Sequence, residues 1–393
     1  MPPTPDAAVL AKPIACDIFC TVVDNFGDIG VCWRLATQLA HEHGWQLRLI
    51  VNDLHTFARL VPAVDPTARC QHVAGIAIEH WGEPVHVGDT LAIADVVVEA
   101  FGCELPAEYV AAMTRRERAP VWINLEYLSA EDWVADFHQR SSPHPRHALF
   151  KSFFFPGLGP GTGGVLKEAG LDARRETFEA SAEAREAWWQ GATGGPVPAR
   201  EACVISLFAY ENPALGPLLE QWRDGDLPVV LLVPEDRICP GIAAFFGLER
   251  FGTGSRAKAG RLSAHGLAFV GQPDYDDLLW ASALNFVRGE DSFVRAQWAR
   301  KPFVWHIYPQ GNDAHLPKLD AALAHLTAGL PEPAREAAAR FWHAWNGAGT
   351  PDWADFLAHR AAFQARAGAW AGQLAAVGDL AGNLAKFTKT QLK

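Results

Sequence analysis

The stretch TVVDNFGDIGVCWRLATQLA (residues 21–40) joins a run of β-branched residues to a helical pattern through a short polar loop. The run that ends at Val23 predicts a strand over 16–23, since β-branched residues pack well on a pleated sheet. Apolar residues then recur at helical spacing, which predicts a helix over 30–42. The first folded unit of the chain is therefore expected to begin with a strand followed by a helix, as in α/β proteins.

Two acidic residues, Asp24 and Asp28, lie in the loop of this stretch. Its glycines, Gly27 and Gly30, do not form a GxGxxG pattern, and two carboxylates would repel the pyrophosphate of a dinucleotide. An NAD(P)-dependent enzyme is therefore disfavoured. One interpretation makes Asp28 an ordinary acid at a helix start, stabilised by the helix dipole. The other makes the two acids a paired carboxylate site for a cation or a general base.

The alternation of strand and helix patterns continues along the chain. Short apolar runs separated by helical segments predict parallel strands. These runs lie at 46–53, 95–102, 120–128, 202–210, 227–235, 266–271, 283–289 and 302–310, and 330–393 is helical in composition. Glycine- and proline-rich stretches at 156–170 and 191–202 predict a loop near the active site and an inter-domain linker. We therefore expect an α/β fold with two Rossmann-like domains that face a central cleft.

The bulk composition excludes several classes of partner. The 393 residues carry a net charge of −11, which disfavours nucleic acid as a partner. No apolar run is long enough to span a bilayer and no signal-peptide pattern is visible, so we expect no membrane partner and a cytoplasmic location. The seven cysteines form no CxxC pair and are expected to be free thiols. The fifteen histidines show no ligand spacing such as HExxH, so no metal is expected.

A second strand-to-helix turn lies within residues 285–310. Arg288 and Gly289 follow a strand expected to end at Val287, and Glu290, Asp291 and Ser292 lead into a helix. Backbone N–H groups at a helix start bind phosphate oxygens, and an arginine adds charge and a fork of donors. The alternative is an ordinary acidic helix start, which leaves a strand-end arginine without a partner.

Aromatic residues lie at the ends of two other expected strands of the second half. Phe208 and Tyr210 follow one strand, and Phe269 and Gln272 follow another. Each aromatic residue taken singly is more often part of a core. Their common place at strand ends favours a site in which aromatic faces hold a nucleobase and Gln272 bonds the base or the sugar.

Three stretches of the chain together resemble one known family. VVDNFGDIGVCWRLATQLA, NLEYLSAEDW and VRGEDSFVRAQWARKPFVWHIYPQ are similar to the elongation factor P arginine rhamnosyltransferases, the EarP family. The resemblance implies a GT-B fold, with an acceptor-side domain at 1–190, a donor-side domain at 200–370 and a C-terminal helix at 371–393 that packs back on the first domain.

The resemblance also implies an activity. The family transfers L-rhamnose from dTDP-β-L-rhamnose to an arginine of translation elongation factor P with inversion, without a metal or other cofactor, and so activates the factor for rescue of polyproline-stalled ribosomes. The essential acids of the family match Asp24, Asp28 and Glu290. Its donor-binding residues match Phe208, Tyr210, Phe269, Gln272, Arg288, Asp291 and Ser292.

This activity gives the acids of the opening stretch a chemical purpose. A guanidinium has a pKa above about 12 and is a poor nucleophile, so its proton must leave as the C–N bond forms. We expect Asp28 to be the general base and Asp24 its positioning partner, while the role of Glu290 stays open between donor and transition state. Asn124, Glu126 and Tyr127, at another strand end, are expected near the acceptor.

Two other functions remain as alternatives. The first is a GT-B transferase that uses another nucleotide-sugar donor or protein acceptor and keeps the phosphate site at Arg288. The second is a non-catalytic nucleotide-sugar-binding module, which the presence of all three acids disfavours.

Overall fold

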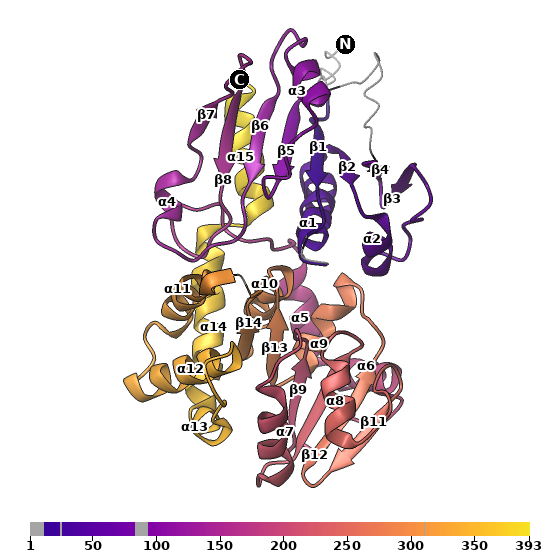
Figure 1. Ribbon diagram of the computed structural model, residues 1–393, viewed down its shortest axis with the longest axis vertical. Coiled ribbons are helices and arrows are strands. Elements are labelled where there is room, and N and C mark those ends of the chain that lie inside the picture. The colour runs from indigo at the N-terminus through magenta and orange to yellow at the C-terminus, as the bar shows by residue number, and fades with distance from the viewer. Residues whose placement is uncertain (1–11, 24–25, 83–92, 310) are drawn as a thin grey trace, which may run out of the picture.

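The computed structural model describes residues 12–23, 26–82, 93–309 and 311–393. The predicted site residue Asp24 lies outside these ranges. The described chain forms two α/β halves, one above the other in Figure 1, each built on its own sheet. Within these residues, no helix has both the length and the apolar character that crossing a membrane requires. All seven cysteines are free thiols, as predicted.

The first half is built on an eight-stranded sheet with the order β3-β4-β2-β1-β5-β6-β8-β7. Neighbouring strands are parallel except for the outermost pairs at both edges, where β3 and β7 run antiparallel to their neighbours. The strands are β1 (Ala15–Cys20), β2 (Gln46–Val51), β3 (Cys70–Val73), β4 (Ile76–His80), β5 (Val96–Ala100), β6 (Val121–Leu125), β7 (Ser141–Pro143) and β8 (Phe150–Phe154). The helices of this part of the chain are α1 (Phe26–His43), α2 (Leu54–Leu60), α3 (Ala107–Met113) and α4 (Val134–Phe137).

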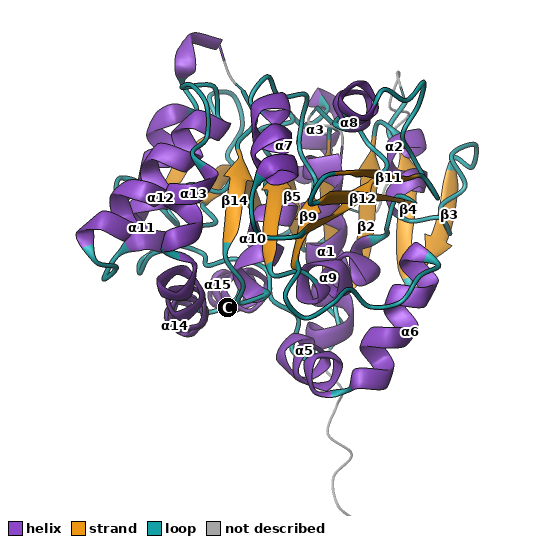
Figure 2. Ribbon diagram, turned by 90° about the horizontal axis from the view of Figure 1, so that it is seen from below, coloured by secondary structure: helices purple, strands orange, loops and turns teal. Residues whose placement is uncertain are grey.

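The second half is built on a six-stranded sheet with the order β11-β12-β10-β9-β13-β14, parallel except for β11. Helices cover both faces of this sheet (Figure 2). The strands are β9 (Cys203–Leu207), β10 (Val229–Pro234), β11 (Arg256–Ala259), β12 (Leu262–Leu267), β13 (Leu284–Arg288) and β14 (Phe303–His306). The helices between and after them are α7 (Leu215–Asp224), α8 (Cys239–Phe246), α9 (Gln272–Ala281), α10 (Asp291–Trp298), η1 (Gly311–Asp313), α11 (Leu316–Thr327), α12 (Glu332–Trp345), α13 (Trp353–Ala358), α14 (Arg360–Val377) and α15 (Leu380–Gln391).

Three predicted element boundaries need correction. The first strand ends at Cys20 and α1 begins at Phe26, so Asp28 lies in the first turn of a helix and not in a loop. The strand predicted at 266–271 is β12, which ends at Leu267, because 268–271 turn toward the start of α9. Arg288 is the last residue of β13, paired in register with β14, and does not follow the strand.

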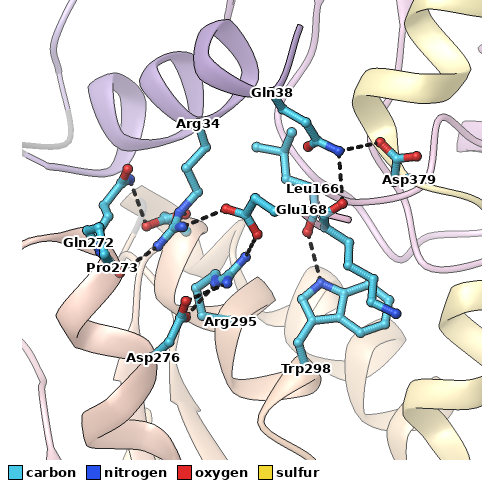
Figure 3. Close-up of polar contacts among 12 residues, drawn as sticks. Arg34, Gln38, Leu166, Glu168, Gln272, Pro273, Asp276, Arg295, Trp298 and Asp379 are labelled. Carbon is cyan, nitrogen blue, oxygen red and sulfur yellow. Dashed lines mark hydrogen bonds and ion pairs between the residues drawn. The ribbon is translucent and has the colours of Figure 1, made fainter. Parts of the chain in front are cut away.

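The chain passes between the two halves in the glycine-rich segment 155–170. The indole of Trp298 donates to the carbonyl oxygen of Leu166 at 2.8 Å, and the amide of Gln38 donates to that of Lys167 at 2.8 Å (Figure 3). The next helices, α5 (Leu171–Ala180) and α6 (Ala182–Thr193), already pack against α9 and β12 of the second half. The predicted division near residue 190 stays a prediction, but these two helices lie with the second sheet.

The last helix returns to the first half. α15 packs against α1 and lies beside the first sheet, as the yellow helix in Figure 1 shows. Leu380, Leu384 and Phe387 of α15 are buried in the core that also contains β1, β2 and α1. Most of the other large apolar side chains of the C-terminal helices belong to the core of the second half. The end of the chain therefore helps to hold the two halves together.

Candidate active site

A pocket between the two halves brings together every residue predicted to bind the donor. We call it the aromatic pocket. Its lining comes from the first half through Phe26, Gly27 and Leu60, and from the second half through residues at and beyond the carboxyl ends of its strands. The predicted residues in the lining are Phe208, Tyr210, Phe269, Gln272, Arg288, Glu290, Asp291 and Ser292. The carboxyl ends of the parallel strands thus point to one cleft, as expected for facing α/β domains.

A second cavity of about 170 Å³ adjoins the aromatic pocket. We call it the acidic cavity, because Asp28 and Glu290 both line it. Gly27, Gly289 and Glu290 line both spaces, so the two spaces adjoin at these residues. The helix start that carries Asp28 and the turn that carries Glu290 therefore meet at one place.

Asp28 is held in the first turn of α1 with 2% of its surface exposed. One carboxylate oxygen accepts a hydrogen bond from the backbone N–H of Val23 at 2.7 Å, and the other accepts one from the hydroxyl of Tyr127 at 3.1 Å. The ring of Tyr127 stacks on Phe101 with centroids 4.4 Å apart. The side chain lies at the N-terminal, positive end of the helix dipole. Asp28 is thus both a helix-start acid and a wall of the acidic cavity, so the two interpretations of this residue are compatible.

Glu290 bridges the halves from the turn between β13 and α10. Its carboxylate accepts a hydrogen bond from the backbone N–H of Leu128 at 3.1 Å. Gly289 precedes it with φ +62°, a conformation that side chains with a Cβ rarely adopt. The carbonyl oxygen of Gly289 also accepts a bond from the indole of Trp305 at 2.8 Å. Hydrogen bonds from Leu128 and from Trp305 therefore hold this turn in place.

Arg288 lies buried at the bottom of the aromatic pocket. Its guanidinium forms an ion pair with the equally buried Asp236 and lies 4.5 Å from the ring centroid of Phe208 and 4.6 Å from that of Tyr210. Its Nη1 has no hydrogen-bond partner within the part of the chain that the structure describes. Such a buried donor is costly unless a ligand oxygen accepts from it. This arrangement suits an anion such as a phosphate.

Two neighbours of Arg288 were not predicted from the sequence. Burial raises the pKa of Asp236, although the charge of Arg288 opposes the rise. Burial also lowers the pKa of His306 to about 3, with a smaller contribution from Arg288, so this histidine is neutral beside Tyr210. Asp236 directly follows the predicted strand over 227–235. This strand-end position is the same feature that pointed to Phe208 and Phe269 as site residues.

Three predicted residues take part in contacts across the domain interface. The ring of Phe269 packs on Phe26 with centroids 4.6 Å apart. The side-chain amide of Gln272 donates to the carbonyl oxygen of Gly30 at 2.9 Å and to Asp291 at 3.1 Å. Both carboxylate oxygens of Asp291 accept hydrogen bonds, one from Arg34 and one from Gln272.

Ser292 and the three predicted acceptor residues also form contacts of their own. The hydroxyl of Ser292 bonds to the backbone of Arg288 and so supports the turn. Asn124 donates to Glu126, and burial raises the pKa of Glu126. Of the three predicted acceptor residues, only Tyr127 lines the acidic cavity. The roles predicted for all these residues stay predictions. Among the described residues, no group of three or more histidine, cysteine, aspartate or glutamate side chains is arranged to hold a metal ion.

Comparisons with known proteins cover almost the whole chain. The family described as "Elongation-Factor P (EF-P) rhamnosyltransferase EarP" matches residues 16–389. A protein-arginine rhamnosyltransferase of Pseudomonas putida is 48% identical over 96% of this chain and 99% of its own length. One from Pseudomonas aeruginosa is 46% identical over 94% and 98%.

Solved structures agree with this assignment. A structure that describes EarP-mediated arginine glycosylation of translation elongation factor EF-P has a TM-score of 0.67 at 36% identity, over 96% of this chain and 99% of that one. A glycosyltransferase from Rickettsia africae, only 10% identical, shares the fold with a TM-score of 0.51 over 97% and 99%. The chain is therefore an enzyme with the GT-B fold, and it belongs to the EarP family of rhamnosyltransferases.

Proposed function

We propose that this enzyme transfers L-rhamnose from dTDP-β-L-rhamnose to one arginine side chain of translation elongation factor P, with inversion at the anomeric carbon. The proposal places the reaction in the cytoplasm, where the modified factor acts on polyproline-stalled ribosomes. The observation that carries it is the junction of the acidic cavity with the aromatic pocket at Gly27, Gly289 and Glu290. In this proposal a site for the cationic guanidinium adjoins a site for the diphosphate.

The aromatic pocket is proposed to hold the nucleotide sugar. Aromatic faces bind a nucleobase by stacking. The diphosphate would then accept from the free Nη1 of Arg288 and from the backbone N–H groups at the start of α10. These groups stabilise the charge that grows on the leaving diphosphate, the contribution that is usually the largest in such reactions.

The acidic cavity is proposed to hold the acceptor arginine. A guanidinium is cationic and matches a carboxylate in a bidentate geometry, and Asp28 and Glu290 line this cavity. Asp24, four residues before Asp28, is proposed as its partner.

The reaction is proposed to be a single displacement. A guanidinium nitrogen attacks the anomeric carbon while the bond from that carbon to the diphosphate oxygen breaks on the opposite face, and this inverts the centre. The proton lost from the nitrogen passes to Asp28 as the C–N bond forms, because a carboxylate is too weak a base to remove it beforehand. The products are rhamnosyl-arginine and dTDP. We propose that no metal takes part, since Arg288 and a helix start supply the positive charge.

The test is intact-mass spectrometry of purified elongation factor P after incubation with this enzyme and dTDP-β-L-rhamnose. The expected result is a mass gain of one deoxyhexose that persists in EDTA and is absent with Asp28→Asn. Glu104→Gln, an exposed acid of the same half, serves as the control and should retain the gain. Absence of the mass gain with a folded enzyme that binds dTDP would refute the proposed acceptor.

A panel of nucleotide sugars tests the alternative donor. If another sugar is transferred faster than rhamnose, the donor assignment is wrong while the site at Arg288 stands. Proton NMR of the product gives the anomeric configuration, and retention would contradict the single displacement.

A further inference from the structure

Arg34 of α1 reaches across the interface into the second half (Figure 3). Its Nε donates to Asp291 Oδ1 at 2.7 Å, its Nη1 to Glu168 Oε1 at 2.9 Å, and its Nη2 to the carbonyl oxygen of Gln272 at 3.3 Å. Only 5% of its surface is exposed. All three guanidinium nitrogens therefore have partners at the edge of the aromatic pocket or in the segment between the halves.

These contacts resolve an electrostatic difficulty in the proposed donor site. Asp291 is the first residue of α10, and it lines the aromatic pocket together with Ser292. A free carboxylate at that place would repel a diphosphate. Arg34 pairs with one of its oxygens and the amide of Gln272 donates to the other, at 3.1 Å, so the adjacent guanidinium offsets the negative charge of this carboxylate.

The position of Arg34 is itself fixed by a buried chain of charges. Arg295 donates to the second oxygen of Glu168 at 2.6 Å and forms two bonds of 2.7 Å with Asp276. Arg295 and Asp276 are 1% and 2% exposed. Buried ion pairs hold one geometry only when each partner is satisfied, which is the case for this chain of side chains.

We propose that Arg34 is a positioning residue of the donor site, and that Asp291 and Gln272 serve there chiefly as its anchors. This rests on the proposed function, because it assumes that a nucleoside diphosphate occupies the aromatic pocket. It assigns part of the donor affinity to the first half of the molecule. It also revises the prediction that Asp291 binds the donor directly: its carboxylate binds Arg34.

The first experiment measures dTDP binding to the full-length enzyme by isothermal titration calorimetry, together with kcat and the KM for the donor. Arg34→Met is expected to raise the Kd for dTDP and the donor KM by about 10-fold or more, with kcat reduced far less, since the lost interactions are charged hydrogen bonds to the binding site. Arg34→Lys keeps the positive charge but lacks the planar guanidinium, so its Kd for dTDP should lie between those of the unaltered enzyme and Arg34→Met. Arg118→Met is the matched control, because the exposed Arg118 also belongs to the first half and donates to a backbone carbonyl oxygen, that of Gln391 at 3.0 Å, but does not line the aromatic pocket. It should bind dTDP like the unaltered enzyme.

The decisive variant is the double substitution Arg34→Met with Asp291→Asn. If Arg34 neutralises Asp291, removal of both charges restores dTDP binding to within a few-fold of the unaltered enzyme. If Arg34 only supports the fold, the double variant binds as weakly as Arg34→Met or more weakly, and the proposal is overturned. Should Arg34→Met fail to fold, as judged by circular dichroism, the same cycle with Arg34→Gln decides.

The outcomes separate this inference from the proposed function. Tight dTDP binding by both the unaltered enzyme and Arg34→Met overturns the role of Arg34 and leaves the proposed donor intact. No dTDP binding by the unaltered enzyme overturns the proposed donor, and the role of Arg34 falls with it.

Discussion

Tyr127 is the side chain that orients the buried carboxylate of Asp28, through the hydroxyl bond of 3.1 Å. We predict that Tyr127→Phe lowers kcat by about 5- to 10-fold, the effect of losing one hydrogen bond of about 1 kcal/mol, and leaves the donor KM unchanged. The ring stays stacked on Phe101, so the fold should persist. Steady-state kinetics measure both constants. Tyr109→Phe is the control, because it removes a hydroxyl that is bonded to Asp17 away from the site. It should lower the stability of the protein and leave kcat unchanged. An unaltered kcat in Tyr127→Phe would contradict the role of this hydroxyl.

Arg288 combines an ion pair, two aromatic faces and one free donor at a single guanidinium. Lysine keeps the charge but cannot provide the planar fork that meets Asp236 and a ligand together. Arg288→Lys is therefore predicted to raise the donor KM by about 10- to 100-fold. Arg237→Lys, one residue after Asp236 and outside the lining of the aromatic pocket, is the control. A donor KM close to that of the control would show that charge alone is sufficient.

At the scale of elements, α15 is the clearest case of a helix whose position depends on distant parts of the chain. It closes the core of the first half, although it follows the whole second half in sequence. Leu384 is completely buried there. Leu384→Ala is predicted to destabilise the protein by about 3 kcal/mol through lost burial and the cavity that remains. Thermal unfolding checks this, with the exposed Lys386→Ala on the same helix as a control expected to change stability by less than about 0.5 kcal/mol. Equal melting temperatures for the two variants would show that α15 is not part of this core.

At the scale of the whole molecule, Glu168 connects the halves through its two arginine partners. Burial by itself raises the pKa of this carboxyl, but Arg295 and Arg34 outweigh it and lower the pKa to about 2. Because the folded pKa lies below that of the unfolded chain, the charged form stabilises the fold. This contribution is complete above about pH 4.5 and is lost as the pH falls toward 2.

The acid stability of the protein tests this linkage. Glu168→Gln is predicted to lower the free energy of unfolding by about 2 kcal/mol at pH 7. This value is smaller than the pKa shift alone would give, because one third of the side chain is exposed and solvent screens its charge. Its stability should then fall less steeply than that of the unaltered protein between pH 4.5 and 2. Chemical denaturation at several pH values measures both slopes, with the exposed Glu117→Gln as the reference. Parallel slopes for Glu168→Gln and the unaltered protein would exclude the predicted linkage.

The amino-acid sequence was sufficient to predict the α/β class, the two facing domains and the strand-end turns that carry Asp28 and Arg288. These features follow from the spacing of apolar residues and from glycines and charges within one turn, which are local properties of the chain. Even the errors were local, such as the one-residue shift at Arg288 and the helix start at Phe26 rather than near residue 30.

Which side chains come into contact could be learned only from the three-dimensional structure. Arg34 and Asp291 are 257 residues apart in sequence, and no local pattern links them. The same holds for the pair of Asp236 with Arg288, the bond from Leu128 to Glu290 and the return of α15 to the first half. Charged side chains that are far apart in sequence become partners only when packing brings them to the same place, and that depends on how the two domains face each other.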